Sequence, residues 1–356
     1  MGQRAVTSPL NEALYFTAPG QVTLRREPCP ALGPGQVRVR TRLSAISPGT
    51  EMLIYRGQMP QGLAADEALE ALAGPLAYPL KYGYAAVGQV TDLGAGVDDS
   101  WAGRWVFAFQ PHQACFVAAV DSLLPVPEGI PPERAAFLPN METAINFLLD
   151  GAPLLGERVV VLGQGVVGLL TTALLARFPL AALVVFDRYA LRRETALALG
   201  ATLALDPAAP DALDAARAHL GARDLYDGAD LTYELSGNPE ALNLAFALTG
   251  FAGRLVIGSW YGTKRAALDL GGRFHRSRIR LLSSQVTTLA PEHTGRWSKA
   301  RRLALAWEML RRFPAERLIT HRVPFIEAPT AYRLLDQQPE NAIQVILTYP
   351  TNQATM

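Results

Sequence analysis

The second half of the chain alternates short, almost continuously apolar runs with longer amphipathic stretches. The runs include RVVVLG, AALVVFDR, TLALDP, DLTYELSG and GRLVIGSWY, and helical periodicity follows most of them. Strands that are apolar along their whole length are typical of a parallel sheet covered by helices on both faces. The alternation therefore predicts an α/β domain with a doubly wound parallel sheet.

The first part of the chain has a different texture and predicts a β-rich domain. Its segments QVTLRREP, QVRVRTRLSAI, AAVGQVTDLG and RWVFAF alternate or are rich in β-branched residues, with Pro and Gly between them. The tail holds one clear helix, SKARRLALAWEMLRRF, and a last strand, AIQVILTY. A length of 356 residues agrees with two domains.

Charge and cysteine content exclude several classes of partner and fold. The 33 basic and 32 acidic residues leave a formal charge of +1, so we expect neither nucleic acid nor a membrane surface as partner. The two cysteines, Cys29 and Cys115, are far apart and have no motif context, which argues against a disulfide framework and a cysteine-rich zinc site. The N-terminus lacks the apolar region of a secretory signal, so we expect a cytoplasmic protein.

A glycine motif lies inside residues 158–178, a segment apolar enough to suggest a membrane span. The motif is GxGxxG, and it follows a predicted strand and opens a predicted helix, which is the context that a dinucleotide-binding fingerprint requires. Its glycines allow a tight turn, a close approach of the backbone to a pyrophosphate, and close packing of the helix on the strand. The predicted contacts are Gly163, Gln164, Gly165, Val166, Val167 and Gly168.

An acidic residue at the end of the next strand favours one form of the cofactor. Asp187 lies about 20 residues beyond the motif, where a carboxylate accepts the adenosine ribose hydroxyls and repels a 2′-phosphate. NAD is therefore the predicted cofactor. The neighbouring Arg188 leaves NADP open, since an arginine there can accommodate the phosphate.

The order of these parts resembles the medium-chain dehydrogenase/reductase family, the fold of zinc alcohol dehydrogenases, over nearly the whole chain. The matching stretches include GPGQVRVRTRLSAISPGTE, YGYAAVGQVTDLGAGV, VVVLGQGVVGLLTTALL and TYELSGNPEALNLAFALTGFAGRLVIG. The resemblance implies a GroES-like catalytic domain over residues 1–140, completed by 287–356, and an inserted Rossmann domain over 141–286. It also implies a small-molecule substrate and a homodimer formed by edge-to-edge pairing of the last Rossmann strands.

The chain departs from the zinc-binding members at their metal ligands. Pro48–Glu51 stands where they have Cys-Gly-Thr-Asp, and Gly83–Ala85 stands where they have Gly-His-Glu. The third ligand position falls near Pro139–Asn140. A catalytic zinc ion needs about three convergent N, S or O ligands, so we expect no metal. His112 lies in a loop of the first domain, where we expect a surface or hydrogen-bonded residue. The motifs SxGTExLxYxGxMP and GYxAxGxV are similar to a zinc-lacking branch that includes bacteriochlorophyllide dehydrogenase.

Without zinc, another group must take the proton of the alcohol as hydride leaves. Thr50 matches the position of the hydroxyl relay in zinc members, and Tyr84 replaces a ligand histidine. The hypothesis is that Thr50 and Tyr84 hold the substrate oxygen, with Glu51 or Lys81 as terminal proton acceptor and Tyr55 close by. Lys81 would favour the ionised tyrosine. The alternative is that Glu51 caps a helix or pairs structurally and that Tyr84 merely fills the space of the metal.

Further cofactor contacts are implied by the resemblance, position by position. Thr143 would lie near the nicotinamide, and Arg192 would contact the adenosine edge. Two pairs at the ends of later strands would line the crevice at the carboxyl edge of the sheet, namely Ser236 with Gly237 and Gly258 with Ser259.

These observations predict a zinc-independent, NAD(H)-dependent dehydrogenase that interconverts a secondary alcohol and a ketone of a polyol, a sugar or a biosynthetic intermediate. Three alternatives remain open: an NADPH-dependent enone or quinone reductase, a hydroxyethyl dehydrogenase of the bacteriochlorophyllide type, and a non-catalytic NAD-binding protein.

Overall fold

The computed structural model describes residues 10–60, 62, 64, 70–222, 224 and 227–350, which divide into two compact units. One unit is formed by residues up to 138 together with residues from 310 onward, and the other by residues 139–309. The first unit therefore uses segments from both ends of the sequence.

The first unit is built from two sheets. Its larger sheet has the order β15-β16-β3-β5-β6-β8, with β7 also paired to β3, and the smaller has the order β2-β1-β4. All pairs are antiparallel except β15 with β16. The strands are β1 (Leu10–Ala18), β2 (Gln21–Pro28), β3 (Gln36–Ala45), β4 (Leu80–Lys81), β5 (Ala86–Leu93), β6 (Trp105–Ala108), β7 (Cys115–Ala119), β8 (Leu124–Pro125), β15 (Ile319–Pro324) and β16 (Gln344–Thr348).

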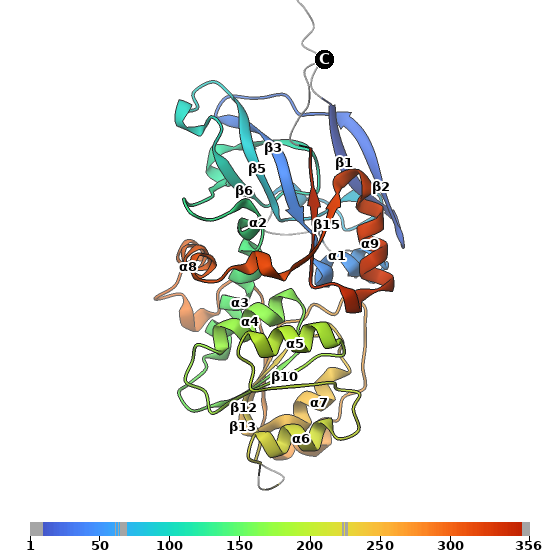
Figure 1. Ribbon diagram of the computed structural model, residues 1–356, viewed down its shortest axis with the longest axis vertical. Coiled ribbons are helices and arrows are strands. Elements are labelled where there is room, and N and C mark those ends of the chain that lie inside the picture. The colour runs from blue at the N-terminus through green and yellow to red at the C-terminus, as the bar shows by residue number, and fades with distance from the viewer. Residues whose placement is uncertain are drawn as a thin grey trace, which may run out of the picture. The chain divides into compact units, whose positions relative to one another are not determined.

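The described residues of the first unit include three α-helices, and two of them surround its core. Helix α1 (Pro48–Tyr55) follows β3, and α9 (Ala328–Gln337) packs against both α1 and β2 (Figure 1). The short α2 (Pro132–Ala135) packs against β5. The apolar side chains between α1, α9 and the small sheet, among them Phe16, Ile54 and Leu335, are buried. This core gives α1 a fixed place, so the side chains on its buried face are held in the interior of the unit.

The second unit confirms the predicted doubly wound sheet. Its six strands are all parallel and have the order β11-β10-β9-β12-β13-β14. They are β9 (Arg158–Leu162), β10 (Ala182–Phe186), β11 (Leu203–Leu205), β12 (Ala229–Glu234), β13 (Thr249–Ile257) and β14 (Arg280–Ser283). The strand order reverses between β9 and β12, and ligands bind at such a switch point in open α/β sheets.

Helices cover both faces of this parallel sheet. Helices α4 (Val166–Leu175) and α5 (Ala190–Ala198) pack together on one face, and α6 (Ala212–His219) and α7 (Ala241–Leu248) pack together on the other (Figure 1). Helix α3 (Leu138–Gly151) leads into the unit, and α8 (Lys299–Arg312) leads out of it. The strands β9 and β10 are almost fully buried, which is why their sequences read as continuous apolar runs.

The segment that resembled a membrane span, residues 158–178, forms the strand β9 and the helix α4. Within the described residues, no helix has the length and apolar character needed to cross a bilayer.

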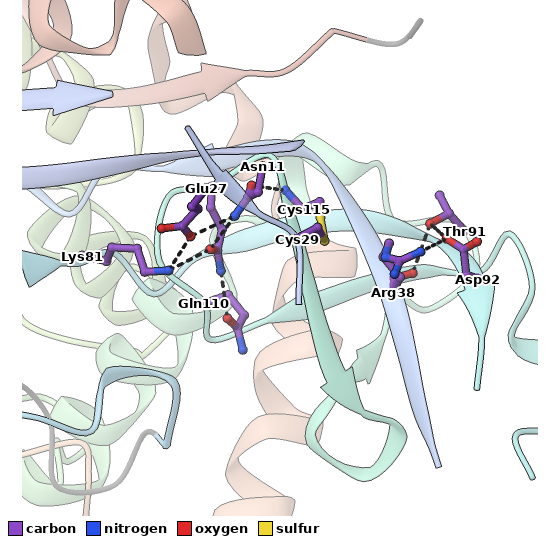
Figure 2. Close-up of a disulfide and its surroundings, with 10 residues drawn as sticks. Asn11, Glu27, Cys29, Arg38, Lys81, Thr91, Asp92, Gln110 and Cys115 are labelled. Carbon is purple, nitrogen blue, oxygen red and sulfur yellow. Dashed lines mark hydrogen bonds and ion pairs between the residues drawn. A yellow bond between two sulfur atoms is a disulfide. The ribbon is translucent and has the colours of Figure 1, made fainter. Parts of the chain in front are cut away.

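A disulfide joins Cys29 to Cys115, contrary to the expectation drawn from their separation in the sequence. The two residues are 86 positions apart, and their Cα atoms lie 6.4 Å apart. Figure 2 shows the bond beside Asn11, whose side-chain oxygen accepts a hydrogen bond from the backbone N–H of Cys115. The folding of β1 and β2 against β7 brings the two cysteines together, and no local motif could have signalled this pairing.

Candidate active site

The glycine motif forms a backbone cradle at the start of α4. Gly163 has φ +92°, and a Cβ placed on it would lie 2.5 Å from the backbone nitrogen of Ser236. A Cβ on Gly168 would lie 2.0 Å from the carbonyl oxygen of Gly163, so this glycine lets the helix lie against the turn. Gly165 precedes the helix, and a Cβ there would meet no atom within 4 Å. The open side of the cradle is thus at Gly165, where backbone N–H groups at a helix N-terminus bind phosphate.

The side chains inside the motif are structural. The amide of Gln164 is fully buried, where its oxygen accepts a hydrogen bond of 2.9 Å from the Thr172 hydroxyl. Val166 and Val167 form the first turn of α4, and Val166 is buried. A dinucleotide would therefore meet the backbone of this segment, which is the mode of binding that the fingerprint predicts.

Asp187 follows β10 and is held by two backbone groups. Its Oδ2 accepts a hydrogen bond of 2.7 Å from the N–H of Gln164, and its Oδ1 accepts one of 2.9 Å from the N–H of Tyr189. Arg192 lies over the Tyr189 ring, with its Nη1 3.9 Å from Asp187 Oδ2, whereas the side chain of Arg188 is exposed. The acidic residue is therefore fixed directly beside the glycine cradle, at the end of the adjacent strand.

The residues that were predicted to line the crevice lie in the loops after β12 and β13, and these two loops contact each other. The hydroxyl of Ser259 accepts a hydrogen bond of 2.9 Å from the N–H of Gly237, so the loops after β12 and β13 are joined. Ser236 lies against Gly163, as described above. Gly258 is closely packed, because a Cβ there would lie 2.3 Å from the Phe147 ring. On α3, the Thr143 hydroxyl donates to the carbonyl oxygen of Pro139 at 2.8 Å.

In the first unit, Glu51 is the centre of a buried polar network. Its side chain on α1 is fully buried, and its Oε1 accepts a hydrogen bond of 2.8 Å from the N–H of Ser47. Its Oε2 accepts one of 2.5 Å from the Tyr332 hydroxyl and lies 3.0 Å from His112 Nε2. Burial and the charge of Glu51 raise the pKa of Tyr332 well above its usual value, so this tyrosine remains a hydrogen-bond donor.

The network continues beyond His112 to the C-terminal strand. His112 is fully buried, and its Nδ1 lies 2.7 Å from the hydroxyl of Ser44. Ser44 in turn is 3.0 Å from the hydroxyl of Tyr349, whose pKa is raised by burial. The sequence singled out Glu51 but missed Ser44, Tyr332 and Tyr349. We define these three residues with Glu51 and His112 as the Glu51 network.

The remaining predicted catalytic residues occupy different surroundings. The hydroxyl of Tyr84 donates a hydrogen bond to the Ser47 hydroxyl, and Thr50 is partly exposed on the first turn of α1. Tyr55 stacks on Tyr332 with ring centroids 5.7 Å apart, and burial raises the pKa of Tyr55. These contacts bring Tyr84 to the N-terminus of α1 and place Tyr55 in the core.

Lys81 pairs with a residue of the small sheet. Its Nζ lies 2.8 Å from the carboxylate of Glu27, and both side chains are partly exposed (Figure 2). The ion pair compensates the charge of Lys81, so the expected influence of this lysine on Tyr84 loses its physical basis.

Gly83 makes room for His112, which gives a test of the Glu51 network. A Cβ on Gly83 would lie 2.6 Å from His112 Cδ2, and the residue has φ +115°, which an L-residue rarely adopts. Gly83→Ala should lower the free energy of unfolding by about 2 to 4 kcal/mol in urea denaturation, since strain and overpacking add. Gly96→Ala is the control, because Gly96 has φ +80° and open space. If both variants lost the same small amount, close packing at His112 would be excluded.

The described residues hold no group of three or more His, Cys, Asp or Glu side chains suited to binding a metal ion. Of the positions where the resemblance implied zinc ligands, Pro48 lies at the start of α1 and the hydroxyl of Tyr84 is hydrogen-bonded to Ser47.

Comparisons with known proteins agree with this architecture. Residues 166–305 match the model of the family "Zinc-binding dehydrogenase". The chain is 25% identical to D-guloside 3-dehydrogenase of Escherichia coli over 351 residues, covering 94% of this chain and 99% of that protein.

Two solved structures share the fold over almost all of the chain. One is described as a short chain alcohol dehydrogenase of Escherichia coli CFT073 in complex with NADH, with a TM-score of 0.76 and 20% identity, covering 95% of this chain and 99% of that one. The other is a putative zinc-binding dehydrogenase of Sinorhizobium meliloti 1021 bound to NADP, with a TM-score of 0.74 and 19% identity, covering 96% and 100%.

The family match lies on the unit that contains the glycine cradle, and the similarity to the curated dehydrogenase extends over both units. The chain is therefore an NAD(P)-dependent oxidoreductase, and it is similar to dehydrogenases of the zinc-binding, alcohol dehydrogenase-like kind.

Proposed function

We propose that the protein is an NAD-dependent dehydrogenase that interconverts a secondary alcohol and a ketone without a catalytic zinc ion. The observation that carries the cofactor assignment is the glycine cradle, open at Gly165, with the carboxylate of Asp187 fixed beside it. This arrangement supports a pyrophosphate at the helix N-terminus and ribose hydroxyls on the carboxylate. A carbohydrate or polyol is the favoured substrate class, because the similar curated protein is named a guloside dehydrogenase.

The proposed mechanism divides the work between the cofactor and the residues near α1. NAD, held at the glycine cradle and Asp187, would supply the hydride acceptor for the substrate carbon. Thr50 and Tyr84 hold the substrate oxygen, and Tyr84 is oriented by its hydrogen bond to Ser47. The alcohol proton passes to these hydroxyl groups and from them to water, because Ser47 and Thr50 are partly exposed. Glu51 is a positioning residue, because its carboxylate is fully buried and holds the backbone N–H of Ser47. The proposed mechanism uses no zinc ion, because Pro48 and Tyr84 stand at expected zinc-ligand positions and the side chain of proline has no donor atom.

The exposed guanidinium of Arg188 favours a second candidate, an NADPH-dependent enone or quinone reductase. It lies next to Asp187 and is free to meet a 2′-phosphate, which the carboxylate would repel. The ratio of NAD to NADP affinity separates the two proposals, and a preference for NADPH would support the reductase.

The test of the proposed function is reduction of NAD by the purified protein with a panel of polyols, sugars and a hydroxyethyl chlorin, in the presence of a strong chelator. Turnover should survive the chelator, and Tyr84→Phe should lower kcat by about 10² to 10⁴. Tyr82→Phe is the matched control, since it removes a hydroxyl from the ring that packs against Tyr84 at 6.2 Å. Loss of turnover with the chelator would contradict metal independence. Full turnover of Tyr84→Phe would remove this residue from the mechanism.

We propose a homodimer that forms along β14, the outer strand of the parallel sheet. Its Leu281 side chain is 43% exposed, and an unpaired strand edge is a template for pairing with a second copy. Leu281→Lys should shift the protein from dimer to monomer in size-exclusion chromatography with light scattering. Leu197→Lys is the control, on the outer surface of α5, where the side chain is 48% exposed. A wild-type protein that is monomeric at all concentrations would overturn the proposal.

A further inference from the structure

A buried carboxylate that the proposed mechanism does not use lies at the carboxyl end of β12. Glu234 is the last residue of this strand, and its side chain is fully buried. It pairs in register with Leu162 of β9, the residue directly before the glycine cradle. Glu234 therefore lies beside the switch point of the sheet, on the side away from β10 and Asp187.

The hydrogen bonds of Glu234 are those of an ionised carboxylate. Its Oε1 accepts from the backbone N–H and from the hydroxyl of Ser236, and its Oε2 accepts a hydrogen bond of 2.5 Å from the Tyr261 hydroxyl. Burial, together with the charge of Glu234, raises the pKa of Tyr261, so the tyrosine keeps its proton and donates. Among the residues that the structure describes, three donors and no acceptor face the carboxylate, as expected for a fixed negative charge.

Few charges compensate Glu234 in its surroundings. No ion pair involves it in the described part of the chain. Lys264, on the loop after β13 that also carries Tyr261, donates from its Nζ to the carbonyl oxygen of Gly237 at 2.8 Å. A buried charge in a medium of low polarity acts over a longer range than an exposed one, because little water screens it.

The position of this charge relative to a dinucleotide follows from the topology. A Rossmann sheet binds one nucleotide on each half, and the two halves meet at the switch point. The acidic residue after the second strand, here Asp187, marks the adenosine half, so the half that begins with β12 takes the nicotinamide nucleotide. The nicotinamide ring carries a positive charge in NAD⁺ and none in NADH.

We infer that Glu234 sets the redox preference of the cofactor site by favouring the cationic NAD⁺ over NADH. This inference rests on the proposed use of NAD. One unit charge about 10 Å away at an effective dielectric constant of ~20 changes an affinity by roughly tenfold. The site thereby binds the oxidised cofactor more tightly than the reduced one.

The experiment is equilibrium titration of the full chain with NAD⁺ and, separately, with NADH, followed by tryptophan fluorescence or calorimetry. Glu234→Gln, which keeps the shape and removes the charge, should weaken NAD⁺ binding relative to NADH by roughly tenfold. Tyr261→Phe keeps the charge and removes one donor, so the ratio of the two affinities should stay within about twofold even if both affinities fall. Equal weakening of both forms by Glu234→Gln would assign Glu234 to loop positioning alone and overturn the inference.

A second variant covers the case in which Glu234→Gln does not fold. Lys264→Met removes a cation from the loop after β13 and should shift the ratio toward NAD⁺ by a few fold. An unchanged ratio in this variant would also overturn the inference. If the wild-type protein bound neither NAD⁺ nor NADH, the proposed function itself would fail, whereas normal binding with an unchanged ratio would remove only the role of Glu234.

Discussion

Gly168→Ala is expected to abolish dinucleotide binding and to lower the stability of the second unit by about 3 kcal/mol or more. The added methyl group would lie 2.0 Å from the carbonyl oxygen of Gly163, and backbone atoms cannot move aside as a flexible side chain can. Helix α4 would have to withdraw from the turn, which would displace the N–H groups that face a pyrophosphate. Urea denaturation and titration with NADH measure the two losses.

Gly165→Ala separates cofactor binding from stability. Gly165 has φ −65° and open space around its Cβ position, so alanine fits the protein itself without strain. The free energy of unfolding of the variant, from urea denaturation, should match that of the wild type within about 0.5 kcal/mol. The variant should nevertheless bind NADH at least tenfold more weakly, because the methyl group occupies the open side of the cradle. Unchanged NADH affinity in Gly165→Ala would place the pyrophosphate elsewhere.

Glu51→Ala is the second variant with a large expected effect. It removes the shared acceptor of the buried Tyr332 hydroxyl, the buried His112 ring and the partly buried Ser47 N–H. Removal of one partner from a fully buried, hydrogen-bonded network costs about 3 to 5 kcal/mol of unfolding free energy. Urea denaturation measures this loss, and far-UV circular dichroism establishes that the variant is folded before denaturant is added.

The controls for Glu51→Ala distinguish burial from charge. Glu133→Ala breaks a partly exposed pair with Arg322 and should cost no more than about 1 kcal/mol. Glu51→Gln keeps an oxygen for the Ser47 N–H and should fall between the two. If Glu51→Ala lost no more unfolding free energy than Glu133→Ala, water or another group would replace the carboxylate. The Glu51 network would then not contribute to the stability of the protein.

The glycine cradle was predictable because its geometry is local. Strand, turn and helix follow one another within residues 158–175. The need for glycine at each motif position comes from the backbone conformation or the space there, which residues close to it largely determine. The parallel sheet was predictable for a related reason, because a strand that is buried on both faces has an almost continuously apolar sequence.

The Glu51 network was not predictable beyond its first member. Ser44 meets Tyr349 across 305 positions, and Glu51 meets Tyr332 across 281. Each of these residues alone reads as an ordinary core tyrosine or strand serine, and the expectation of a surface or hydrogen-bonded His112 did not identify its partners. The pairing of Cys29 with Cys115 was missed for the same reason, because contacts between distant segments have no local signature.

The discontinuity of the first unit has a consequence for the order in which the protein is completed during synthesis. A ribosome releases β3 and α1 early and the whole second unit next, but Tyr332 and Tyr349 emerge last. A parallel sheet made of one continuous segment folds as soon as it is available, as domains generally do. The buried side of α1, with the carboxylate of Glu51, must therefore wait for the final strand and helix, and the nascent chain holds a finished second unit before it holds a finished first one.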